Sequence, residues 1–400
     1  MNGAPMTVPA YAIDEASMIE FLTRYVAARS YSTEESAAAT LLTAEMEKLG
    51  FGVEVDEWGN LIGTMHLGEG PTVLIDCHMD TVVVTDESVW EHHPWGEIAD
   101  DGRFYGRGTA DMKGPTASAL YGLAALKNGS VGTLVLSGTI AEELAEGPAL
   151  IKVCERVEPD FVITAESTNL RLNHGQRGRG EVLVSVHGKS SHSAHPTAGI
   201  NAAQVMADVI TALRDIPVPH QEELGDGILV LTDIISRPYP GLSVQPDLCQ
   251  ATYDRRLLVG ETEENVLGPI REIVGEICAK HGTTGTVEIA YDDFTTYNGT
   301  HVRFPNFAPA WLTDPESALV TEAQAALAAA ELPSELGTYK FCTNASGSAG
   351  KLGIPSIGYG PGEEDQAHTV DESISVADLA RAAVGFAAIV DSILTSGARA

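Results

Sequence analysis

The sequence is poor in basic residues and has no long hydrophobic run. Its 400 residues include 24 Lys and Arg against 56 Asp and Glu, which gives a formal net charge of -32. A protein with this charge repels the phosphate backbone of nucleic acids and the anionic headgroups of membranes, so both are disfavoured as partners. No segment approaches the roughly 18 consecutive apolar residues that indicate a membrane-spanning helix.

Cysteine is also scarce. The five cysteines, at positions 77, 154, 249, 278 and 342, are odd in number, scattered, and without Cys-x-x-Cys spacing. This pattern disfavours a disulfide framework and a cysteine-based metal site. The first residues, Met1 to Thr23, lack the basic stretch followed by an apolar core that an export signal requires. The sequence therefore predicts a soluble, unexported protein with reduced thiols in the cytoplasm.

One stretch with a recognisable chemical pattern runs from Val73 to Thr81, where an apolar strand leads directly into His78 and Asp80. Residues two positions apart on an extended segment point to the same side. Asp80 can therefore hold one ring nitrogen of His78 while the other nitrogen faces a metal ion. Alone, the pattern is weak, because a buried histidine bound to an acid is more often structural.

Strands alternate with helices over residues 30 to 166, which indicates an α/β layer with a largely parallel sheet. Ser32, followed three residues later by Glu35, predicts a capping box at the start of a helix that Gly50 ends. In open α/β sheets, functional groups collect beyond the carboxyl ends of the strands. Four candidate side chains follow such strand ends: His78, Glu142, Glu143 and Glu166.

The pattern changes after Gly175, where a glycine-rich joint leads into a different unit. A strand, a helix, two strands, a helix and a strand follow, and this order predicts a compact α+β, ferredoxin-like unit. An alanine-rich helix, a short strand and a final helix then complete the first domain. We therefore expect two domains, one made of residues 1–177 with 297–400 and the other an insertion at 178–296.

Five candidate metal ligands lie at strand ends or in loops: His78, Asp111, Glu143, Glu166 and His368. Two imidazoles and three carboxylates suit zinc or a neighbouring divalent ion. Five ligands are too many for one tetrahedral centre, whereas two ions that share one carboxylate would use all of them. Adjacent Glu142 and Glu143 would by default be interpreted as a solvated acidic pair, but an apolar strand leads directly into them.

Six motifs follow one another in the chain: Asp76-Cys-His-Met-Asp-Thr81, Tyr105-Gly-Arg-Gly-Thr-Ala-Asp-Met-Lys-Gly114, Ala141-Glu-Glu143, Ala165-Glu166, Gly188-Lys-Ser-Ser-His-Ser193 and Ala367-His-Thr369. In this order they resemble the M20 metallopeptidase family of dinuclear zinc amidohydrolases, which includes acetylornithine deacetylases, succinyl-diaminopimelate desuccinylases and glutamate carboxypeptidases. The resemblance covers nearly the whole chain. It implies a zinc-peptidase-like catalytic domain, with a mixed, mostly parallel sheet flanked by helices, and an inserted lid and dimerisation domain.

The resemblance also implies how the metal ions would be held. Asp111 would bridge two ions and would be followed by a non-proline cis peptide. The other four candidate ligands would divide between the ions, with His78 and Glu166 on one, and Glu143 and His368 on the other. Zn2+ is the expected metal, with Co2+ and Mn2+ as alternatives.

Further roles follow from the same resemblance. Glu142 would be the general base that takes a proton from the attacking water and passes it to the departing amine. His192 would reach the active site of a partner subunit and stabilise the oxyanion, which implies a homodimer built through the inserted domain. Arg256 would bind a substrate carboxylate. The ordinary alternatives are a surface histidine, with His195 as a rival, and a surface arginine in a salt bridge. Asp80 is interpreted as the residue that orients His78.

Two segments depart from the family pattern. Ser243-Val-Gln-Pro246 stands where many relatives carry an Asn, and residues 342–349 stand where many carry Gly-Gly-Thr/Ser-Asp. Both segments contact substrate in relatives, so Asn344 and Ser346 are candidate substrate-binding residues, but specificity is not carried over. The second segment, with Gly358-Tyr-Gly-Pro-Gly362 and Gly175-Gln-Arg-Gly178, looks closer to the YgeY-like branch.

The sequence therefore predicts a cytoplasmic, homodimeric, dinuclear-zinc hydrolase that cleaves an amide bond of a small N-acyl amino acid. A dipeptidase or carboxypeptidase of the same family is the alternative. A metal- or ligand-binding protein without catalysis is less favoured, because the ligands and a separate base are present together. A phosphate loop at Gly347 to Lys351 and a serine hydrolase are disfavoured, since their patterns are incomplete.

Overall fold

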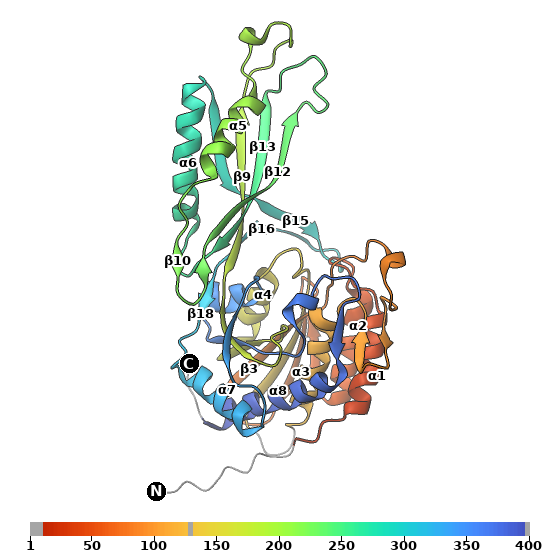
Figure 1. The fold of residues 1–400 in the computed structure, drawn as a ribbon. Coiled ribbons are helices and arrows are strands. Elements are labelled where there is room, and N and C mark those ends of the chain that lie inside the picture. The colour runs from red at the N-terminus through yellow and green to blue at the C-terminus, as the bar shows by residue number, and fades with distance from the viewer. Residues whose placement is uncertain (1–10, 127–130, 397–400) are drawn as a thin grey trace. The chain divides into compact units, whose positions relative to one another are not determined.

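Figure 1 shows the computed structural model of the chain, which describes residues 11–126 and 131–396. The chain forms two compact units: a first of residues 1–176, 293–302 and 312–400, and a second of residues 177–292 and 303–311. The predicted division at residues 178 and 296 stays a prediction. The first ten residues, on which the expectation of no export signal partly rests, lie outside the described residues.

The first unit is built on a mixed sheet of nine strands. Their order is β1 (Gly52–Val55), β2 (Leu61–His66), β6 (Thr133–Thr139), β3 (Thr72–His78), β7 (Phe161–Thr164), β20 (Ser356–Gly358), β8 (Leu172–Gln176) and β18 (Trp311–Leu312), with β19 (Leu336–Tyr339) paired to β8. The central strands β6, β3, β7 and β20 are parallel to their neighbours in this group. The mixed, largely parallel sheet predicted from the sequence is confirmed.

Side chains that alternate along β3 pack into two different cores. Val73 and Ile75 belong to a large cluster that also receives α1 (Glu15–Ala27), α2 (Ser36–Leu49), α3 (Gly114–Ala124), α7 (Ala318–Ala329) and α8 (Val376–Ser396). Leu74, between them in sequence, belongs to a smaller cluster with Val153 of α4 (Pro148–Val157). Because both faces are covered by apolar groups, β3 is buried from Val73 to His78.

The second unit is an antiparallel sheet with two helices packed into its core. The strand order is β12 (Ile228–Arg237), β13 (Leu248–Leu257), β9 (Gly178–His187) and β14 (Thr284–Ile289), and β17 (Phe307–Ala308) also pairs with β9. Helices α5 (Ala202–Leu213) and α6 (Glu263–Lys280) contribute to the apolar cluster of this unit. The predicted order of strand, helix, two strands, helix and strand is confirmed.

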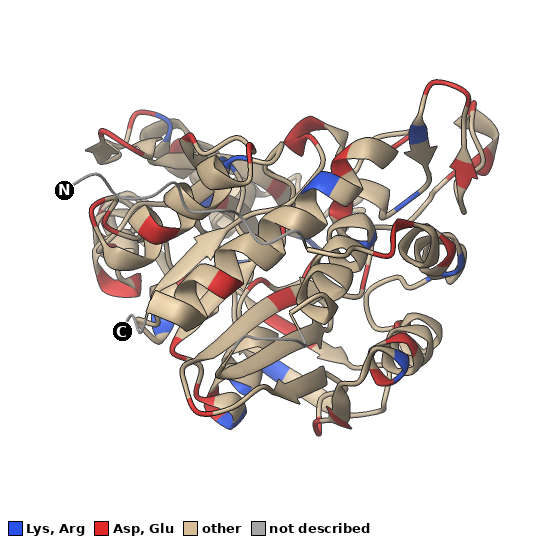
Figure 2. Ribbon diagram, turned by 90° about the horizontal axis from the view of Figure 1, so that it is seen from below, with Lys and Arg blue, Asp and Glu red and all other residues tan. Residues whose placement is uncertain are grey.

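Shorter elements complete the described chain. The remaining strands are β4 (Glu97–Ile98), β5 (Arg103–Tyr105), β10 (His220–Gln221), β11 (Gly225–Asp226), β15 (Tyr291–Thr295), β16 (His301–Pro305) and β21 (Ser373–Ser375). The single turns are η1 (Glu87–Val89), η2 (Thr109–Lys113), η3 (Pro196–Ala198), η4 (Ser346–Lys351) and η5 (Glu364–Gln366). Acidic residues are spread over many helices and loops (Figure 2), with fewer basic residues among them. None of the described helices is long and apolar enough to cross a bilayer.

The predicted capping box at Ser32 and Glu35 is wrong. Helix α2 begins at Ser36, and Glu35 occupies its N-cap position without a side-chain bond to the helix. The Ser32 hydroxyl instead donates to Oδ2 of Asp80 at 2.6 Å. A capping hydroxyl accepts from amides of the first helical turn, and because α2 begins at Ser36, Ser32 does not occupy the N-cap position.

Candidate metal centre

The five predicted ligands come from five separate segments of the first unit, and their side chains converge. His78 ends β3, Asp111 lies in η2, Glu143 follows β6, Glu166 follows β7, and His368 lies between η5 and β21. Three of them follow parallel strands whose carboxyl ends are aligned, since His78 pairs with Thr139 in the sheet register. The sheet therefore explains why residues far apart in sequence meet at one edge.

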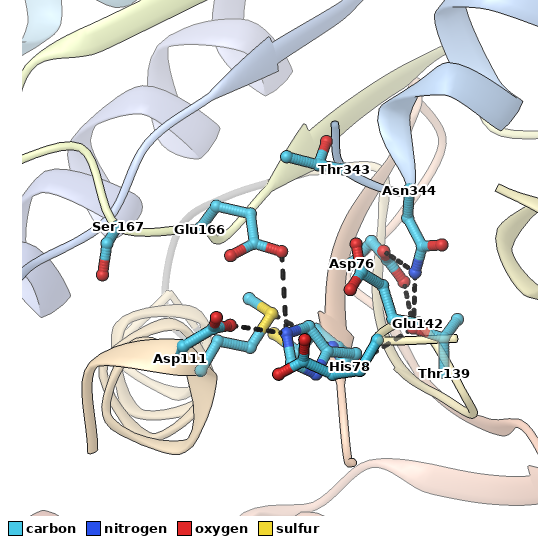
Figure 3. Close-up of polar contacts among 12 residues, drawn as sticks. Asp76, His78, Asp111, Thr139, Glu142, Glu166, Ser167, Thr343 and Asn344 are labelled. Atoms are coloured by element: carbon cyan, nitrogen blue, oxygen red, sulfur yellow. Dashed lines mark hydrogen bonds and ion pairs between the residues drawn. The ribbon is translucent and has the colours of Figure 1, made fainter. Parts of the chain in front are cut away.

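One group of contacts forms around His78 (Figure 3). Its Nε2 atom lies 2.9 Å from Oδ1 of Asp111 and 3.7 Å from Oε1 of Glu166. Its other ring nitrogen, Nδ1, lies 2.9 Å from the main-chain oxygen of Asp80 and 3.5 Å from the Oδ1 atom of that residue. The main-chain oxygen is the nearer partner, so Nε2 is the nitrogen that faces the acidic cluster.

A second group of contacts forms around His368. Its Nε2 atom lies 2.8 Å from Oε2 of Glu143 and 3.2 Å from Oδ2 of Asp111. Asp111 thus presents one carboxylate oxygen to each histidine. The peptide bond between Asp111 and Met112 is cis, as the resemblance implied.

The cluster contains more carboxylates than histidines, and the pKa shifts of its members reflect this excess of negative charge. Burial raises the pKa of Glu166 well above its usual value and that of Glu143 to about 7, and the charge of Asp111 acts in the same direction. Although burial opposes it, hydrogen bonds with His368 and His78 lower the pKa of Asp111. Hydrogen bonds with Asp111 and Glu143 raise the pKa of His368 to about 10. The cluster therefore retains protons in positions where a bound cation would replace them.

The donor set fits divalent cations. Single ligand atoms of His78, Asp111 and Glu143 all lie within 4.8 Å of one another. Oε1 of Glu143 is buried and has no hydrogen-bond partner among the described residues, so it has an unused lone pair. Imidazole nitrogens and carboxylate oxygens are the ligands that zinc and its neighbours accept in proteins.

Glu142 lies beside the cluster and is buried, with 6% of its surface exposed. Burial raises its pKa well above the usual range, and the charges of Glu166 and Glu143 add to this while that of His78 opposes it. The amide nitrogens of Glu142 and Glu143 donate to the two carboxylate oxygens of Asp80, at 3.0 and 3.1 Å. The Asp80 side chain therefore holds the turn after β6 as well as lying near His78.

The two candidate substrate residues of the 342–349 segment bond within the protein. The Asn344 amide nitrogen donates to Asp76 Oδ2 at 3.1 Å and to Thr139 Oγ1 at 3.0 Å, which Figure 3 shows to the right of His78. Its oxygen accepts from the amide of Gly147 at 2.8 Å. The Ser346 hydroxyl donates to the main-chain oxygen of Glu146. Their role in substrate binding stays a prediction.

The remaining two candidates, His192 and Arg256, lie in the second unit. His192 is exposed, and its Nδ1 atom accepts from the amide of Ala194 at 3.0 Å. Arg256 lies on β13, partly exposed, and its Nε atom lies 2.8 Å from Asp254. The neighbouring Arg255 is buried on the other face of the strand and pairs with Glu261.

Sequence reasoning missed two buried charged residues next to the ligands. Glu372 accepts from the amides of Gly108, Ala110 and Asp111 at 2.8 to 3.0 Å. Lys113 donates to the main-chain oxygens of Tyr25 and Ala28 at the end of α1. The available signal was their position, since each stands within four residues of a predicted ligand.

Comparison with known proteins agrees with this geometry. Residues 74–392 match the model of peptidase family M20/M25/M40. The chain is 32% identical over 388 residues to the uncharacterized protein YgeY of Escherichia coli K12, with 94% of both chains covered. It is 29% identical over 346 residues to an acetylornithine deacetylase of Aliivibrio fischeri, covering 82% and 84% of the two chains. The solved structure of the aminopeptidase PepT from Bacillus cereus has a TM-score of 0.74 at 22% identity, covering 95% of this chain and 99% of that one, which shows a shared fold.

Proposed function

The chain belongs to peptidase family M20/M25/M40, and we propose from this premise that it uses two divalent metal ions, Zn2+ as the first choice, to hydrolyse the amide bond of a small N-acyl amino acid. The observation that carries the proposal is the orientation of Asp111. Its Oδ1 atom faces His78 and its Oδ2 atom faces His368. A carboxylate that presents one oxygen to each of two ligand groups is suited to bridge two ions.

Each ion would then have its own ligands. His78 and Glu166 would hold one ion, Glu143 and His368 the other, and Asp111 would contact both. When bound, the ions lower the pKa of a water molecule toward neutrality and polarise the amide carbonyl of the substrate. Asp80, through its main-chain oxygen, would keep Nε2 of His78 directed at the cluster.

Glu142 would move the proton. Its burial and its raised pKa suit a carboxylate that takes a proton from the attacking water and then returns it to the departing amine. Because two hydrogen bonds from the main chain of Glu142 and Glu143 fix this turn to Asp80, the Glu142 carboxylate would approach the substrate from a defined direction. Such orientation is part of the rate enhancement that a buried base supplies.

The choice of substrate rests on the relatives. The deacetylase of Aliivibrio fischeri is more similar in sequence to this chain than the aminopeptidase of known structure, so an N-acyl amino acid is proposed first and a dipeptide second. Arg256 is proposed to bind the substrate carboxylate and His192 to stabilise the oxyanion. Asn344 and Ser346 would shape the substrate site from the 342–349 segment.

We further propose a homodimer that forms through the second unit. Strand β12 is an edge strand of its sheet, and it carries exposed Val230, Ile234 and Ile235. An exposed apolar edge is a template for pairing with another chain. A monomer in sedimentation velocity would contradict the dimer.

All five cysteines are buried thiols, which supports the reducing compartment predicted from the sequence.

One assay tests the proposed function. Metal-reconstituted protein is incubated with a panel of N-acyl amino acids and dipeptides, with and without a chelator. We expect N-acyl amino acids to be cleaved fastest and the chelator to abolish cleavage. Faster cleavage of dipeptides would favour the peptidase alternative. Cleavage that resists the chelator, or no cleavage across a broad panel, would contradict the proposal.

A further inference from the structure

Three consecutive main-chain amides after β6 point into buried carboxylates that come from elsewhere in the chain. The amides of Glu142 and Glu143 donate to Asp80. The amide before them, that of Ala141, donates to Oε1 of Glu35 at 3.0 Å. The main chain of the turn is therefore held by side chains from elsewhere in the chain at Ala141, Glu142 and Glu143.

Glu35 has no evident role in its own helix. It is fully buried and stands immediately before α2, yet its side chain caps none of the helix amides. Oε1 also accepts from the amide of Thr33 at 3.0 Å, while Oε2 is buried without a partner among the described residues. A buried carboxylate costs free energy unless its bonds offset the loss of water. Of the two hydrogen bonds that Oε1 accepts, the one from the Ala141 amide is the long-range contact.

The conformation of Ala141 shows what this bond holds. Its φ angle is +51°, in the left-handed region that residues with a side chain rarely adopt. This conformation costs about 1 to 2 kcal/mol for a residue other than glycine, and it persists where the surroundings enforce it. The backbone at Ala141 sets the direction in which the next residue, Glu142, leaves the strand.

We propose that Glu35 is a positioning residue for Glu142, because it fixes the Ala141 amide and with it the turn from which Glu142 reaches the cluster. Ser32, in the same segment as Glu35, donates to Asp80. Residues 32–35 therefore supply one of the two carboxylates that hold this turn and a hydrogen bond to the other. The segment precedes residues 74–392, which match the family model. The catalytic part of this inference rests on the proposed function, whereas the structural part does not.

Three substitutions separate the reach of the side chain from its charge. Glu35→Gln keeps an acceptor oxygen at the same distance and places its amide nitrogen where Oε2 has no partner. Glu35→Asp keeps the charge but withdraws the carboxylate by one methylene. Glu35→Ala removes the acceptor. If Glu35 acts by holding Ala141, the Gln variant should behave like wild type, and the Asp and Ala variants should not. Glu34→Gln, at an exposed neighbouring position, is the matched control.

Hydrogen exchange of the peptide that covers residues 139–146 is the first readout, and it needs no substrate. We expect exchange about 10-fold faster in the Asp and Ala variants and unchanged in the Gln and Glu34→Gln proteins. The second readout is turnover of the panel substrate that wild type cleaves fastest, at full metal occupancy. We expect kcat about 10- to 100-fold lower in the Asp and Ala variants, because a misplacement of a catalytic group by about 1 Å can lower the rate by about 100-fold. KM should stay within about threefold of the wild-type value.

The two readouts can fail separately. Unchanged exchange in the Asp variant, or faster exchange in the Gln variant, would overturn the inference. Wild-type kcat in an Asp variant whose turn exchanges faster would also overturn it. If wild type cleaves no panel substrate, the proposed function fails, and the exchange data alone decide whether Glu35 holds the turn. If the Ala variant does not fold, the Asp and Gln variants provide the comparison.

Discussion

The two histidines of the candidate centre are held in different ways. His78 ends a central strand, its side chain is 1% exposed, and both of its ring nitrogens are within hydrogen-bond distance of a partner. His368 lies in a loop, has a left-handed φ of +63°, and its side chain is 52% exposed. One histidine is built into the core of the first unit, and the other is carried by a surface segment over the same carboxylate.

This difference indicates a division of labour within the site. A side chain at a buried strand end moves only when the core moves, so we expect the contacts around His78 to be formed before any metal ion binds. A loop side chain can adjust at low cost because few contacts oppose its motion. We therefore expect the His78 half to contribute to the stability of the fold and the His368 half to respond to metal and substrate.

The largest effect is expected at Glu142, which is not a proposed ligand of either metal ion. Glu142→Gln should lower kcat by about 10²- to 10⁴-fold, which is roughly 3 to 5.5 kcal/mol of barrier, because the amide cannot accept the proton. Metal content should stay at the wild-type level, since both ligand groups are intact. Steady-state kinetics with metal analysis on the same sample provide the check. Wild-type turnover at full occupancy would remove Glu142 from the mechanism.

The difference between the two histidines is tested by replacing each of them with alanine and studying the metal-free proteins. His78→Ala leaves the buried Glu166 carboxylate without its histidine partner, and a broken buried pair costs about 3 to 5 kcal/mol of unfolding free energy. His368→Ala removes a partly exposed contact, for which about 0.2 to 1 kcal/mol is typical. Urea denaturation of both variants measures the two losses. Equal losses would show that the two halves are held alike.

The parts of the site that the sequence predicted are those set by strand ends. His78, Glu143 and Glu166 follow apolar strands, and the parallel sheet brings such ends together, so a pattern of apolar runs and polar ends was sufficient. The two candidate ligands in loops, Asp111 and His368, were suggested by residue type alone, and only the resemblance to a family assigned them to particular ions. No periodicity predicts where an irregular segment will place a side chain.

The supporting carboxylates were not predicted, for a physical reason. Glu35 and Ala141 are 106 positions apart, and the bond between them uses a main-chain amide. Every residue except proline offers the same amide, so the partner leaves no mark on the sequence. Ser32 and Glu35 satisfied a local helix-cap pattern, and the tertiary bonds to Asp80 and Ala141 won over it. Local rules fail most readily at a functional site.

Burial of Glu35 should be visible in the pH dependence of stability. Its pKa is raised to about 7, mainly by burial and then by the charge of Asp80. A raised pKa means that the folded state holds the proton more tightly than the unfolded state. Wild type therefore loses stability as pH rises from about 4.5 through 7, by up to roughly 3 kcal/mol. Glu35→Gln has no such proton and should not show this loss.

Urea denaturation of metal-free protein from pH 5 to 8 measures this effect. The stability of Glu35→Gln relative to wild type should increase across this range and then level off above about pH 8. Glu34→Gln, on the exposed side of the same segment, should keep a constant difference from wild type. A constant difference for Glu35→Gln as well would mean that the carboxylate is not held in a desolvated environment.

The smallest effect is expected at Glu372, which joins the two halves. It stands four positions after His368, is fully buried, and its Oε1 atom accepts from the amides of Ala110 and Asp111. Its Oε2 atom accepts from the amide of Gly108 and from the guanidinium of Arg107 at 2.6 Å. One carboxylate thus ties the loop that carries Asp111 to the loop that carries the exposed His368.

Glu372→Gln turns an NH2 group toward at least one of these donors, so the two loops can no longer be held by four accepted bonds. Partners of metal ligands typically contribute about 10- to 100-fold to metal affinity. We expect a loss of this size for Zn2+, measured by competition with a chelating dye. Glu363→Gln, nearby and paired with Arg103, should bind Zn2+ like wild type. If Glu372→Gln also binds Zn2+ with wild-type affinity, the loop that carries His368 is positioned without the bonds of Glu372 to the loop of Asp111. The rigidity expected around His78 would then not include His368.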